Sequence, residues 1–410
     1  MKRQQALTLY LVVVFLLSIV MGLQIITVPW LALDFLGLSP FAVGLIQAAV
    51  LVPNVLLLVI GGVSIDRGTL LHKFLWLLIL YSSVHIYLLV VLVQGWLSFV
   101  LLSVYALLLG SIVAFIQPCK DYIVGSLSGD SLPENIAKNN LSQYFGQAVG
   151  IGIAPFIYTW ELKLLPLTQV VLLGLAALGF YLLSFSHRQL VDDSALRKIR
   201  KPLSLTVFVS GFQFCWQSKV LRSLIAIVSV NGFFHIGVFI VALPLLAKNI
   251  YIGDVGFYSL LQGLFILGTI ITTVLVIVRG QLDSPGRRVI FSVLYAGLIL
   301  LGLSAGPTQE GLMFLIFLWG IVVGISANLG RSILQSQALA EYRGRAISIY
   351  QFALFGCAPL GALFAGIVVE WWGVLYLLKI SAIASFIAFA GTFFTRSLWD
   401  IEAEHTLSTK

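Results

Sequence analysis

Long apolar blocks alternate with short polar stretches along the whole chain. Because about 20 apolar residues cross a bilayer as one helix, this pattern predicts a polytopic α-helical membrane protein. The apolar blocks predict twelve membrane-spanning helices. They cover residues 7–33, 41–62, 74–94, 97–126, 139–160, 165–186, 220–247, 254–279, 288–306, 311–338, 345–369 and 373–395.

The polar stretches between these blocks carry unequal charge, which orients the chain. One set of loops contains Arg67, Lys73, Lys138, Arg279, Arg287, Arg288, Arg343 and Arg345. The other set contains only Lys163 and Lys248 as basic residues. Because cytoplasmic loops carry an excess of Lys and Arg, we expect the first set and both chain ends to be cytoplasmic. The first apolar block resembles a signal peptide, but it continues past Trp30, so we interpret it as a span.

Composition supports this class and excludes others. Of the 410 residues, 60% are hydrophobic and 10% are charged, whereas soluble domains carry about 25% charged residues. Basic cytoplasmic loops account for the net charge of +8, so we expect no nucleic-acid partner. Cys119, Cys215 and Cys357 are scattered, which predicts neither disulfides nor a metal site. Without HExxH, a nucleotide P-loop or a plausible Ser/His/Asp set, we expect no catalytic residues, no cofactor and no enzyme activity.

The two halves of the chain look like copies of one another. Five landmarks recur in order, between 208 and 217 residues apart: Gly22 with Gly232, Gly44 with Gly256, Asp66 with Asp283, Lys120 with Arg331, and Gln143 with Gln351. Two bundles with a site between them are a common transporter plan. We therefore expect six-helix bundles at 1–186 and 220–396, a cytoplasmic linker with an amphipathic segment at 187–219, and a cytoplasmic tail at 397–410.

A charged loop follows the second span of each half. The stretches are "GGVSIDRGTLLHK" (61–73) and "RGQLDSPGRR" (279–288). They resemble the Gly-x-x-x-Asp-Arg-x-Gly-Arg-Arg loop of the major facilitator superfamily of secondary transporters. The first copy matches at Gly62, Asp66 and Arg67, and the second copy, which is one residue short, matches at Gly280, Asp283, Gly286, Arg287 and Arg288. With twelve spans, the resemblance covers about the whole chain.

The acidic residue of each loop suggests a latch. An Asp at a helix end can pair with Arg from a neighbouring helix, and such pairs can hold the cytoplasmic side shut. We expect Asp66 to pair with Arg343 or Arg345, and Asp283 to pair with Lys138. An Asp66→Asn variant should then impair transport but not assembly.

Three further stretches resemble the enterobactin-exporter-like branch of the superfamily, a group of transmembrane secretion effectors and drug–proton antiporters. They are "PCKDYIVGSLSGDSLPENIAKNN", "SGFQFCWQSKVLRSL" and "EYRGRAISIYQFALFGCAPLGALFAG". The resemblance implies a bacterial inner-membrane protein that exports siderophores, macrolides or other drugs in exchange for protons. One departure is Lys120, where the branch usually has Arg, so the charge is kept without the bidentate fork.

By the same resemblance, the first, fourth, seventh and tenth spans line a central cavity. Lys120 and Arg331 lie on two of these spans at matched positions. Since a charge at mid-membrane costs about 2.5–3.5 kcal/mol on insertion scales, the pair suggests a pocket that attracts anions. The alternative is that both lie near the cytoplasmic helix ends, snorkelling or pairing with Asp121. Asp121 is itself either a coupling residue or a structural partner.

Other polar residues within the apolar blocks are candidates for binding substrate or protons. Gln24 lies on the first span, and Asn231 and His235 lie four residues apart on the seventh, where they share one face. His235 is either a proton carrier or a neutral side chain bonded between helices. Asp34 is either wetted at the outer surface or involved in proton coupling. Asn328 on the tenth span could bond a ligand or a neighbouring helix.

These features predict a secondary transporter that works by alternating access. We expect proton-coupled export of an amphiphilic, anionic small molecule such as a siderophore, by a monomer whose partners are that substrate, protons and the lipid bilayer. The alternatives are a siderophore importer and a multidrug efflux pump for hydrophobic drugs. A membrane sensor or scaffold without flux is remote, because the chain has no soluble signalling domain.

Overall fold

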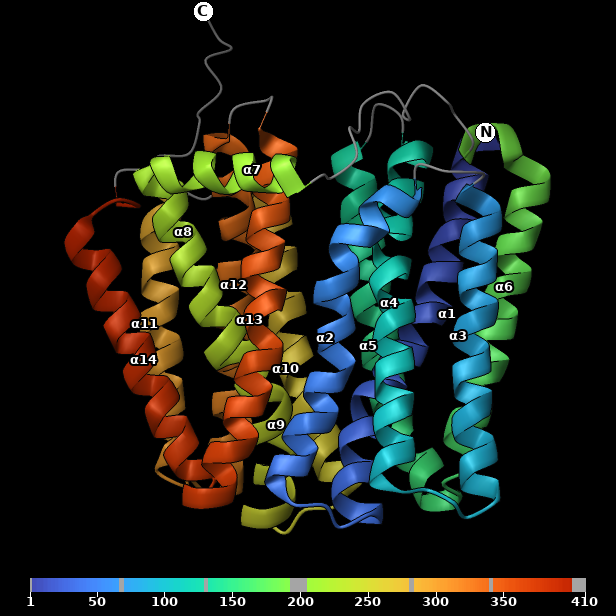
Figure 1. The fold of residues 1–410 in the computed structure, drawn as a ribbon, viewed down its shortest axis with the longest axis horizontal. Coiled ribbons are helices and arrows are strands. Elements are labelled where there is room, and N and C mark those ends of the chain that lie inside the picture. The colour runs from blue at the N-terminus through green and yellow to red at the C-terminus, as the bar shows by residue number, and fades with distance from the viewer. Residues whose placement is uncertain are drawn as a thin grey trace, which may run out of the picture. The chain divides into compact units, whose positions relative to one another are not determined.

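The protein is all-helical and consists of two compact helical units, as Figure 1 shows for the computed structural model. The structure describes residues 2–65, 70–128, 132–191, 205–279, 284–338 and 342–399. Unit 1 contains Met1–Leu203 and Gly253–Leu260, and unit 2 contains Ser204–Ile252 and Leu261–Lys410. The expected membrane fold of two related helical bundles is confirmed.

Unit 1 is built mainly from the first half of the chain. Its elements are α1 (Lys2–Trp30), the π-helical turn η1 (Leu31–Phe35), α2 (Pro40–Ile65), α3 (Leu70–Val93), α4 (Phe99–Ser128), α5 (Leu132–Trp160) and α6 (Leu164–Val191). Helix α1 packs against α5 and α6, α2 packs against α4, and α3 packs against α4 and α6. The first helix of this half, α1, therefore packs mainly against the last two, α5 and α6.

Unit 2 repeats this plan with one additional helix. Its elements are α7 (Leu205–Gln217), α8 (Lys219–Val230), η4 (Asn231–Gly237), α9 (Val238–Leu245), η5 (Leu246–Ile250), α10 (Val255–Arg279), α11 (Pro285–Ser304), α12 (Gln309–Gln337), α13 (Arg343–Trp372) and α14 (Val374–Thr395). The first residues of α10 belong to unit 1. The run from α8 to η5 corresponds to α1, because it packs against α13 as α1 packs against α5.

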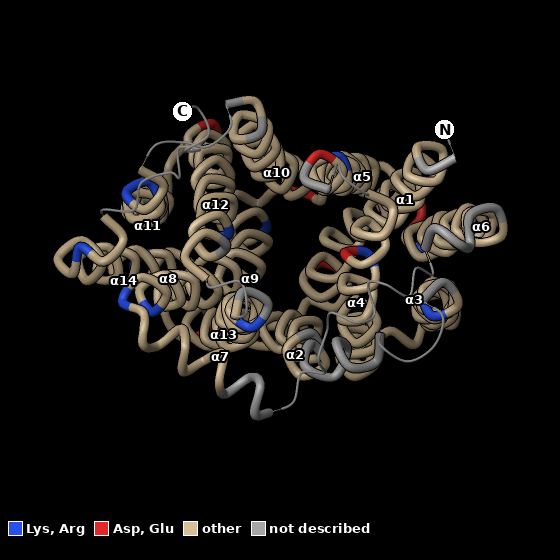
Figure 2. Tube along the Cα trace, turned by 90° about the horizontal axis from the view of Figure 1, so that it is seen from above, with Lys and Arg blue, Asp and Glu red and all other residues tan. Residues whose placement is uncertain are grey.

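Eleven helical segments in the described residues are long and apolar enough to cross a membrane. They correspond to eleven of the twelve expected spans, and few of their positions are charged (Figure 2). The remaining span, expected at 139–160, lies within α5, whose 29 residues rise by about 1.5 Å each and are long enough to cross a bilayer. Its polar residues Asn139, Asn140, Ser142, Gln143 and Gln147 are wholly or partly buried. Helix α5 is therefore a helix of spanning length that is too polar to stand out by hydropathy.

Glycines bring the first and fifth helices of each half into backbone contact. A Cβ atom added at Gly22 in α1 would overlap the carbonyl oxygen of Gln147 in α5. A Cβ atom added at Gly232, its counterpart in η4, would overlap the carbonyl oxygen of Leu354 in α13. Small residues allow membrane helices to pack this closely. The matched glycines Gly22 and Gly232 thus mark equivalent crossings of the first and fifth helices in the two halves.

A second pair of glycines repeats between the second and fourth helices. Gly110 in α4 faces the carbonyl oxygen of Val50 in α2, and Gly320 in α12 faces that of Phe265 in α10, with no room for a Cβ atom in either case. Gly110 and Gly320 are separated by the same interval as Gly22 and Gly232. Two helix crossings in each half are therefore built in the same way.

The first membrane helix of each half also ends in the same wide turn. Turn η1 begins two residues after Pro29, and η5 begins two residues after Pro244. A proline inside a helix removes one backbone hydrogen bond and crowds the preceding turn, which favours a local change of helical pitch. Each turn is closed by an i→i+5 bond, from Leu36 to Leu31 at 3.0 Å and from Tyr251 to Leu246 at 3.1 Å.

The second residue after each wide turn has a left-handed backbone, but only one half places a glycine there. Gly37 has φ 59°, and its counterpart Ile252 has φ 51° and is 89% exposed. A left-handed backbone costs an L residue about 1–2 kcal/mol, and Asn tolerates it better than a β-branched residue. We therefore expect Ile252→Asn to raise the free energy of unfolding by about 1 kcal/mol.

Thermal unfolding of the detergent-purified protein measures this gain, with Ile250→Asn as the control. Ile250 is also exposed but lies within η5, where it has no left-handed backbone to relieve. Equal effects of the two substitutions would contradict the strain at Ile252.

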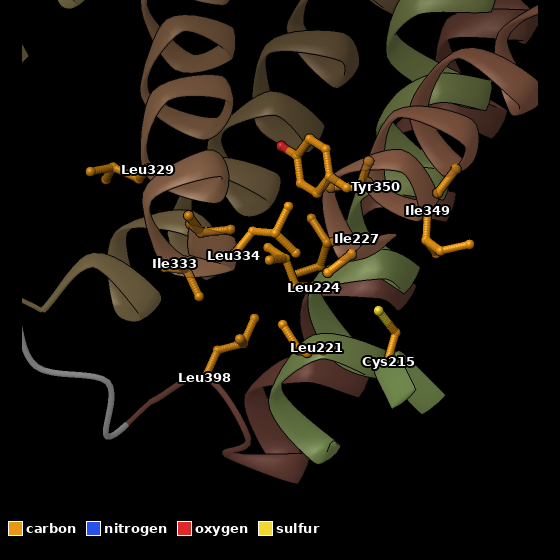
Figure 3. Close-up of a cluster of buried hydrophobic side chains, with 14 of the residues drawn as sticks. Cys215, Leu221, Leu224, Ile227, Leu329, Ile333, Leu334, Ile349, Tyr350 and Leu398 are labelled. Atoms are coloured by element: carbon orange, nitrogen blue, oxygen red, sulfur yellow. The ribbon is translucent and has the colours of Figure 1, made fainter. Parts of the chain in front are cut away.

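Helix α7 is fixed to unit 2 by an apolar cluster. It lies crosswise over the ends of α8 and α13 (Figure 1). Its residue Cys215 packs with Leu221 and Leu224 of α8 and with Leu334 of α12 (Figure 3). Leu398, from the segment expected to be a tail, is fully buried in the same cluster. The chain on both sides of the second half is thus anchored to that half.

Candidate functional site

Lys120 is the most deeply buried of the predicted binding residues. It lies in α4, has no exposed surface, and its Nζ donates to Oε1 of Gln143 in α5 at 2.8 Å. The hydroxyl of Tyr10 in α1 donates to the backbone carbonyl of Lys120 at 2.9 Å. Three helices of unit 1 thus meet at Lys120, α5 at its ammonium group and α1 at its backbone carbonyl. The side chain is enclosed between helices and does not snorkel to a helix end.

Asp121 differs from Lys120 in burial although it is the next residue. Its side chain is exposed, and its Oδ1 accepts a hydrogen bond from Nε2 of Gln117 one turn earlier, at 3.2 Å. Successive residues of an α-helix lie about 100° apart around the axis, which accounts for the difference in burial. Lys120 and Asp121 therefore present a buried cation and an exposed carboxylate on two faces of α4.

Arg331 occupies the matched place in unit 2 but is held differently. It lies on α12 and is exposed. Gln351 of α13, the counterpart of Gln143, is partly buried. Between these two described residues no hydrogen bond corresponds to the one between Lys120 and Gln143. The cation of unit 1 is therefore locked to a neighbouring helix, whereas that of unit 2 has a solvent-accessible side chain.

Gln24 belongs to a polar cluster deeper in unit 1. Its Oε1 accepts a hydrogen bond from the hydroxyl of Tyr81 in α3 at 2.7 Å. One turn further, Nδ1 of the fully buried His85 lies 2.8 Å from the carbonyl oxygen of Tyr81. The ring of Tyr105 in α4 meets His85 edge-on. Nε2 of His85 and the hydroxyl of Tyr105 are both buried without a hydrogen-bond partner.

Asn231 and His235 lie on η4, a π-helical stretch within the first membrane helix of unit 2. Nδ2 of Asn231 donates to Oγ of Ser326 in α12 at 3.1 Å, while Nε2 of His235 lies 3.1 Å from Oγ of Ser385 in α14. His235 is buried, its Nδ1 has no hydrogen-bond partner, and it meets Trp319 of α12 edge-on. The two side chains that sequence spacing placed on one face therefore bond to different helices.

Asn328 joins a ladder of polar groups between α10 and α12. Its Nδ2 donates to Oγ1 of Thr273 at 3.2 Å and to the carbonyl of Gly324 at 2.8 Å. The hydroxyls of Thr269 and Thr272 donate to the carbonyls of Gly320 and Ile321 in α12. The sequence did contain a signal for this ladder, the run "TIITT" at 269–273. The hydropathy pattern places that run within an apolar block and does not predict the ladder.

Asp34 lies in η1, away from the groups around Lys120 and Gln24. Its Oδ2 accepts a hydrogen bond from the hydroxyl of Tyr158 in α5 at 2.5 Å, and its side chain is exposed. Among the described residues no group of His, Cys, Asp and Glu side chains could hold a metal ion. The site residues thus form separate clusters within the two units.

A family model described as the Major Facilitator Superfamily matches residues 10–355. The chain belongs to this superfamily. It is a multi-pass membrane protein and a secondary transporter rather than an enzyme. A comparison with curated protein sequences found no match.

Solved structures of transporters share the fold of this superfamily member. A POT family transporter in complex with a thioalcohol-conjugated peptide has a TM-score of 0.74 and 13% identity, over 96% of each chain. The nucleoside transporter NupG has a TM-score of 0.71 and 12% identity, over 97% of this chain and 99% of that one. The human organic anion transporter MFSD10 has a TM-score of 0.67 and 13% identity, over 95% of this chain and 99% of that one.

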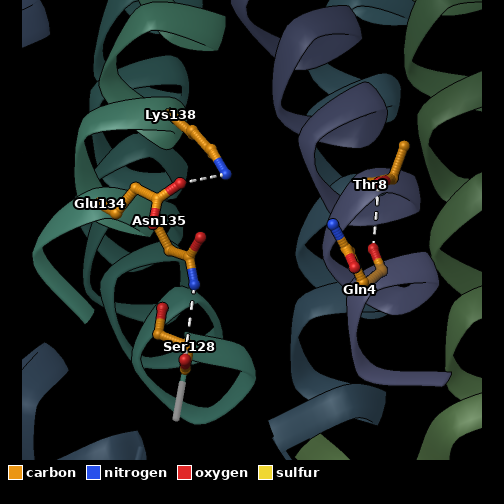
Figure 4. Close-up of polar contacts among 6 residues, drawn as sticks. All are labelled: Gln4, Thr8, Ser128, Glu134, Asn135 and Lys138. Atoms are coloured by element: carbon orange, nitrogen blue, oxygen red, sulfur yellow. Dashed lines mark hydrogen bonds and ion pairs between the residues drawn. The ribbon is translucent and has the colours of Figure 1, made fainter. Parts of the chain in front are cut away.

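The loop motifs of the superfamily lie partly outside the described residues. These are Asp66, Arg67, Gly280 and Asp283, together with the side-chain surroundings of Gly62 and Arg343. Gly286 is buried in the first turn of α11, and Arg288 is exposed in the same turn. Lys138, the expected partner of Asp283, forms a 2.7 Å ion pair with Glu134 on its own helix (Figure 4).

Arg287 of the second loop motif holds the C-terminal segment. Its Nε donates to the backbone carbonyl of Trp399 at 3.2 Å, and its guanidinium lies 5.1 Å from the Trp399 ring centre. A cation over an indole ring is stabilised by the ring quadrupole. In this transporter, Arg287 therefore binds the C-terminal segment of unit 2, a contact that the loop motif did not predict.

Arg345, an expected latch partner of Asp66, contacts α7. Its Nη1 donates to Oγ of Ser210 at 3.2 Å, and its guanidinium lies 4.8 Å from the ring centre of Tyr342. A Cβ atom at Gly211 of α7 would press on the Cβ of Arg345, at 2.8 Å, so a glycine is needed for α7 to lie this close. Arg345 therefore joins the linker helix to the start of α13.

Proposed function

We propose that this transporter exports an amphiphilic, anionic small molecule, of the kind represented by carboxylate or catecholate siderophores, in exchange for protons. It works by alternating access as a monomer in the inner membrane of a bacterium, with both termini in the cytoplasm. It belongs, on this proposal, to the enterobactin-exporter-like branch of the superfamily.

The observation that carries the anion preference is the enclosed ammonium of Lys120. The only hydrogen-bond acceptor that a described side chain offers this Nζ is the neutral amide oxygen of Gln143. An ammonium has three donors, and a buried charge is expensive unless it is paired and fully hydrogen-bonded. An anionic substrate would supply further acceptors and a negative charge beside the ammonium when the helices around Lys120 open.

Two further observations support an anionic, amphiphilic cargo. Arg331, at the matched position, has an exposed guanidinium that can form bidentate bonds to a carboxylate. One solved structure of the same fold is that of a human organic anion transporter. The aromatic rings of Phe233, Phe234 and Phe364, which contact one another in unit 2, offer apolar surface of the type that suits the hydrophobic part of such a cargo.

Proton coupling is tested by flux into sealed vesicles that contain the purified protein. A gradient of about 100 mV supplies about 2.3 kcal/mol per elementary charge, enough for roughly 50-fold accumulation. We expect accumulation to vanish when the pH gradient and the membrane potential are both collapsed. Undiminished accumulation under that condition would exclude coupling to protons.

A substitution at His235 locates the proton. Its Nδ1, buried without a partner, is the atom at which we propose that a proton is held during the cycle. His235→Gln keeps a group that can bond to Ser385 but cannot titrate, so we expect flux that no longer responds to the gradient. His85→Gln is the matched control, a buried histidine of unit 1, and should leave coupling intact. If His235→Gln still couples, the carrier is Asp121 or Asp34.

The cargo and its direction are identified by profiling metabolites in cells and medium, with and without the gene. Export predicts that an anionic metabolite disappears from the medium of cells that lack the gene and accumulates inside them. Import predicts the opposite distribution. Loss of resistance to hydrophobic drugs, without any change in anionic metabolites, would favour a multidrug efflux pump.

A further inference from the structure

A cavity of about 510 Å³ lies within unit 2, between α8 and α14. The two helices run in opposite directions beside it, and the hydroxyls of Ser223 and Ser397 meet across one end at 2.6 Å. None of the polar residues assigned above to substrate or protons lines this cavity. A ligand of this cavity would therefore bind at a different place from the transported cargo.

One end of the cavity is positively charged and rich in hydroxyl groups. Lys219 and Arg222, from the first turn of α8, line it together with Ser223, Thr395 and Ser397. The lining residues include no Asp or Glu, and neither cation has an ion pair among the described residues. The first turn of α8 adds the positive end of its helix dipole.

The rest of the cavity is lined mostly by apolar residues, together with Thr392. Along α8 the lining continues with Ala226, Ile227 and Val230, and along α14 with Gly391 and Ala388. At about 1.5 Å per residue, Val230 lies roughly 16 Å along the helix from Lys219. The cavity thus has a charged head region and an apolar groove that extends into the depth of the bundle, which matches the shape of a lipid rather than that of a soluble anion.

Neighbouring surfaces indicate that the head region lies at a membrane–water boundary. Phe212 and Trp216 of α7 are exposed and stack on one another with ring centres 5.5 Å apart. Trp216 also lies 5.9 Å from the guanidinium of Arg222. Tryptophan gathers at the level of lipid headgroups, and a helix with one packed face and exposed aromatic residues is typical of an interfacial helix. The exposed Phe394 of α14 provides a lipid-facing surface beside the cavity.

We propose that the groove between α8 and α14 is a binding site for an anionic phospholipid of the adjacent leaflet. The phosphate binds Lys219, Arg222 and the hydroxyl of Ser223, and one acyl chain lies along Ala226, Val230 and Gly391. The charged end is the one that the loop charges predict to be cytoplasmic, and anionic lipids are concentrated in that leaflet. The bound lipid would tie α8, which continues into the helix that carries His235, to α14.

Native mass spectrometry of the detergent-purified full chain tests this site. Phosphatidylglycerol and phosphatidylcholine of identical acyl chains are added separately. We expect the wild type to retain phosphatidylglycerol about tenfold more strongly, because each charge-assisted bond contributes a factor of this order. The double variant Lys219→Gln/Arg222→Gln should lose that preference. Lys379→Gln, which removes an exposed cation from the opposite end of α14, should keep it.

A second variant tests the acyl groove without altering any charge. A Cβ atom at Gly391 meets nothing within 4 Å, so the backbone there accepts a side chain, and Gly391→Phe would place a ring in the groove. It should lower retention of phosphatidylglycerol about tenfold. Gly174→Phe, at an exposed glycine of α6 with equally open surroundings, is the matched control.

Three outcomes would overturn the proposal. Equal retention of both lipids by the wild type would remove the charge preference. Wild-type retention by the double charge variant would remove the headgroup site. If Gly391→Phe keeps full affinity while glycerol 3-phosphate displaces the lipid from the wild type, the site is one for small anions only. None of these outcomes depends on which cargo the protein transports.

Discussion

Gly150→Ala is expected to lower the free energy of unfolding by about 3 kcal/mol or more, whereas Gly152→Ala, two residues along the same helix, is expected to change it little. A Cβ atom at Gly150 would overlap the carbonyl oxygen of Ile19 and lie 2.9 Å from Cα of Gly22, so α1 and α5 would have to separate. A Cβ atom at Gly152 meets nothing within 4 Å. The measurement is unfolding in mixed micelles, followed by tryptophan fluorescence.

The duplicated fold extends this prediction to unit 2. Gly232→Ala should be as damaging as Gly150→Ala, because its Cβ atom would overlap the carbonyl oxygen of Leu354. Gly263→Ala on α10 is the corresponding control, since its surroundings are open. Equal stability of the crowded and open variants would show that the helices of each half can slide apart without cost, contrary to the close packing described.

Lys120→Gln is expected to weaken binding of an anionic cargo about tenfold or more, because a hydrogen bond to a charged group contributes about 1.5–3 kcal/mol. The glutamine can still donate to Gln143, so the contact between α4 and α5 is kept. Arg331→Gln should have a similar effect on anions. Neutral amphiphiles should bind either variant within about twofold of the wild type, since they make no charge-assisted bond.

Direct titration of anionic and neutral ligands against the purified variants separates binding from folding. A Gln143→Met variant is the structural comparison, because it leaves Lys120 in place but removes its acceptor. We expect that variant to lose stability by about 3 kcal/mol, as for a buried ion left without its partner. Equal, small losses for both ligand classes in Lys120→Gln would mean that Lys120 is structural, and the anion preference would be abandoned.

Hydropathy predicted most of this fold because the solvent of a membrane helix is itself apolar. Eleven spans stand out for that reason, and their ends differ from the expected ones by a few residues. A span was predicted at 139–160, within α5. The polar side chains of this helix are accommodated by burial against other helices. Ser142, for example, donates a hydrogen bond to the carbonyl of Leu11 in α1 at 2.8 Å. The repeat was recognisable because Gly22 and Gly232 each occupy a position where a larger side chain does not fit.

The site was predicted less completely, because one-dimensional spacing does not give the partner of a side chain. The match of Lys120 with Arg331 did not reveal that only Lys120 is enclosed. The spacing of Asn231 and His235 placed both side chains on one face, but it did not reveal that Asn231 bonds to α12 and His235 to α14, or that η4 is π-helical. No local sequence rule marks such a turn without knowledge of what packs around it.

The loop motif shows a different limit. Its residues were recognised by type, but a guanidinium can bond to a carboxylate, a hydroxyl, a carbonyl or a ring. Arg287 and Arg345 use the last three, with Trp399, Ser210 and Tyr342. The latch between Asp66 and the start of α13 stays a prediction, since Asp66 lies outside the described residues.

The polarity of α5 constrains how the protein is synthesised. A segment with Asn139, Asn140, Gln143 and Gln147 partitions poorly from the translocon into lipid on its own, because each amide must find a partner in the hydrocarbon. For Gln143 that partner is Lys120, which lies on a helix that is made earlier. We therefore expect the first four helices to remain together beside the insertion channel until α5 emerges, so that the N-terminal half enters the membrane as a cotranslational unit. Its counterpart α13 is apolar enough to insert alone, and the C-terminal half carries no such requirement.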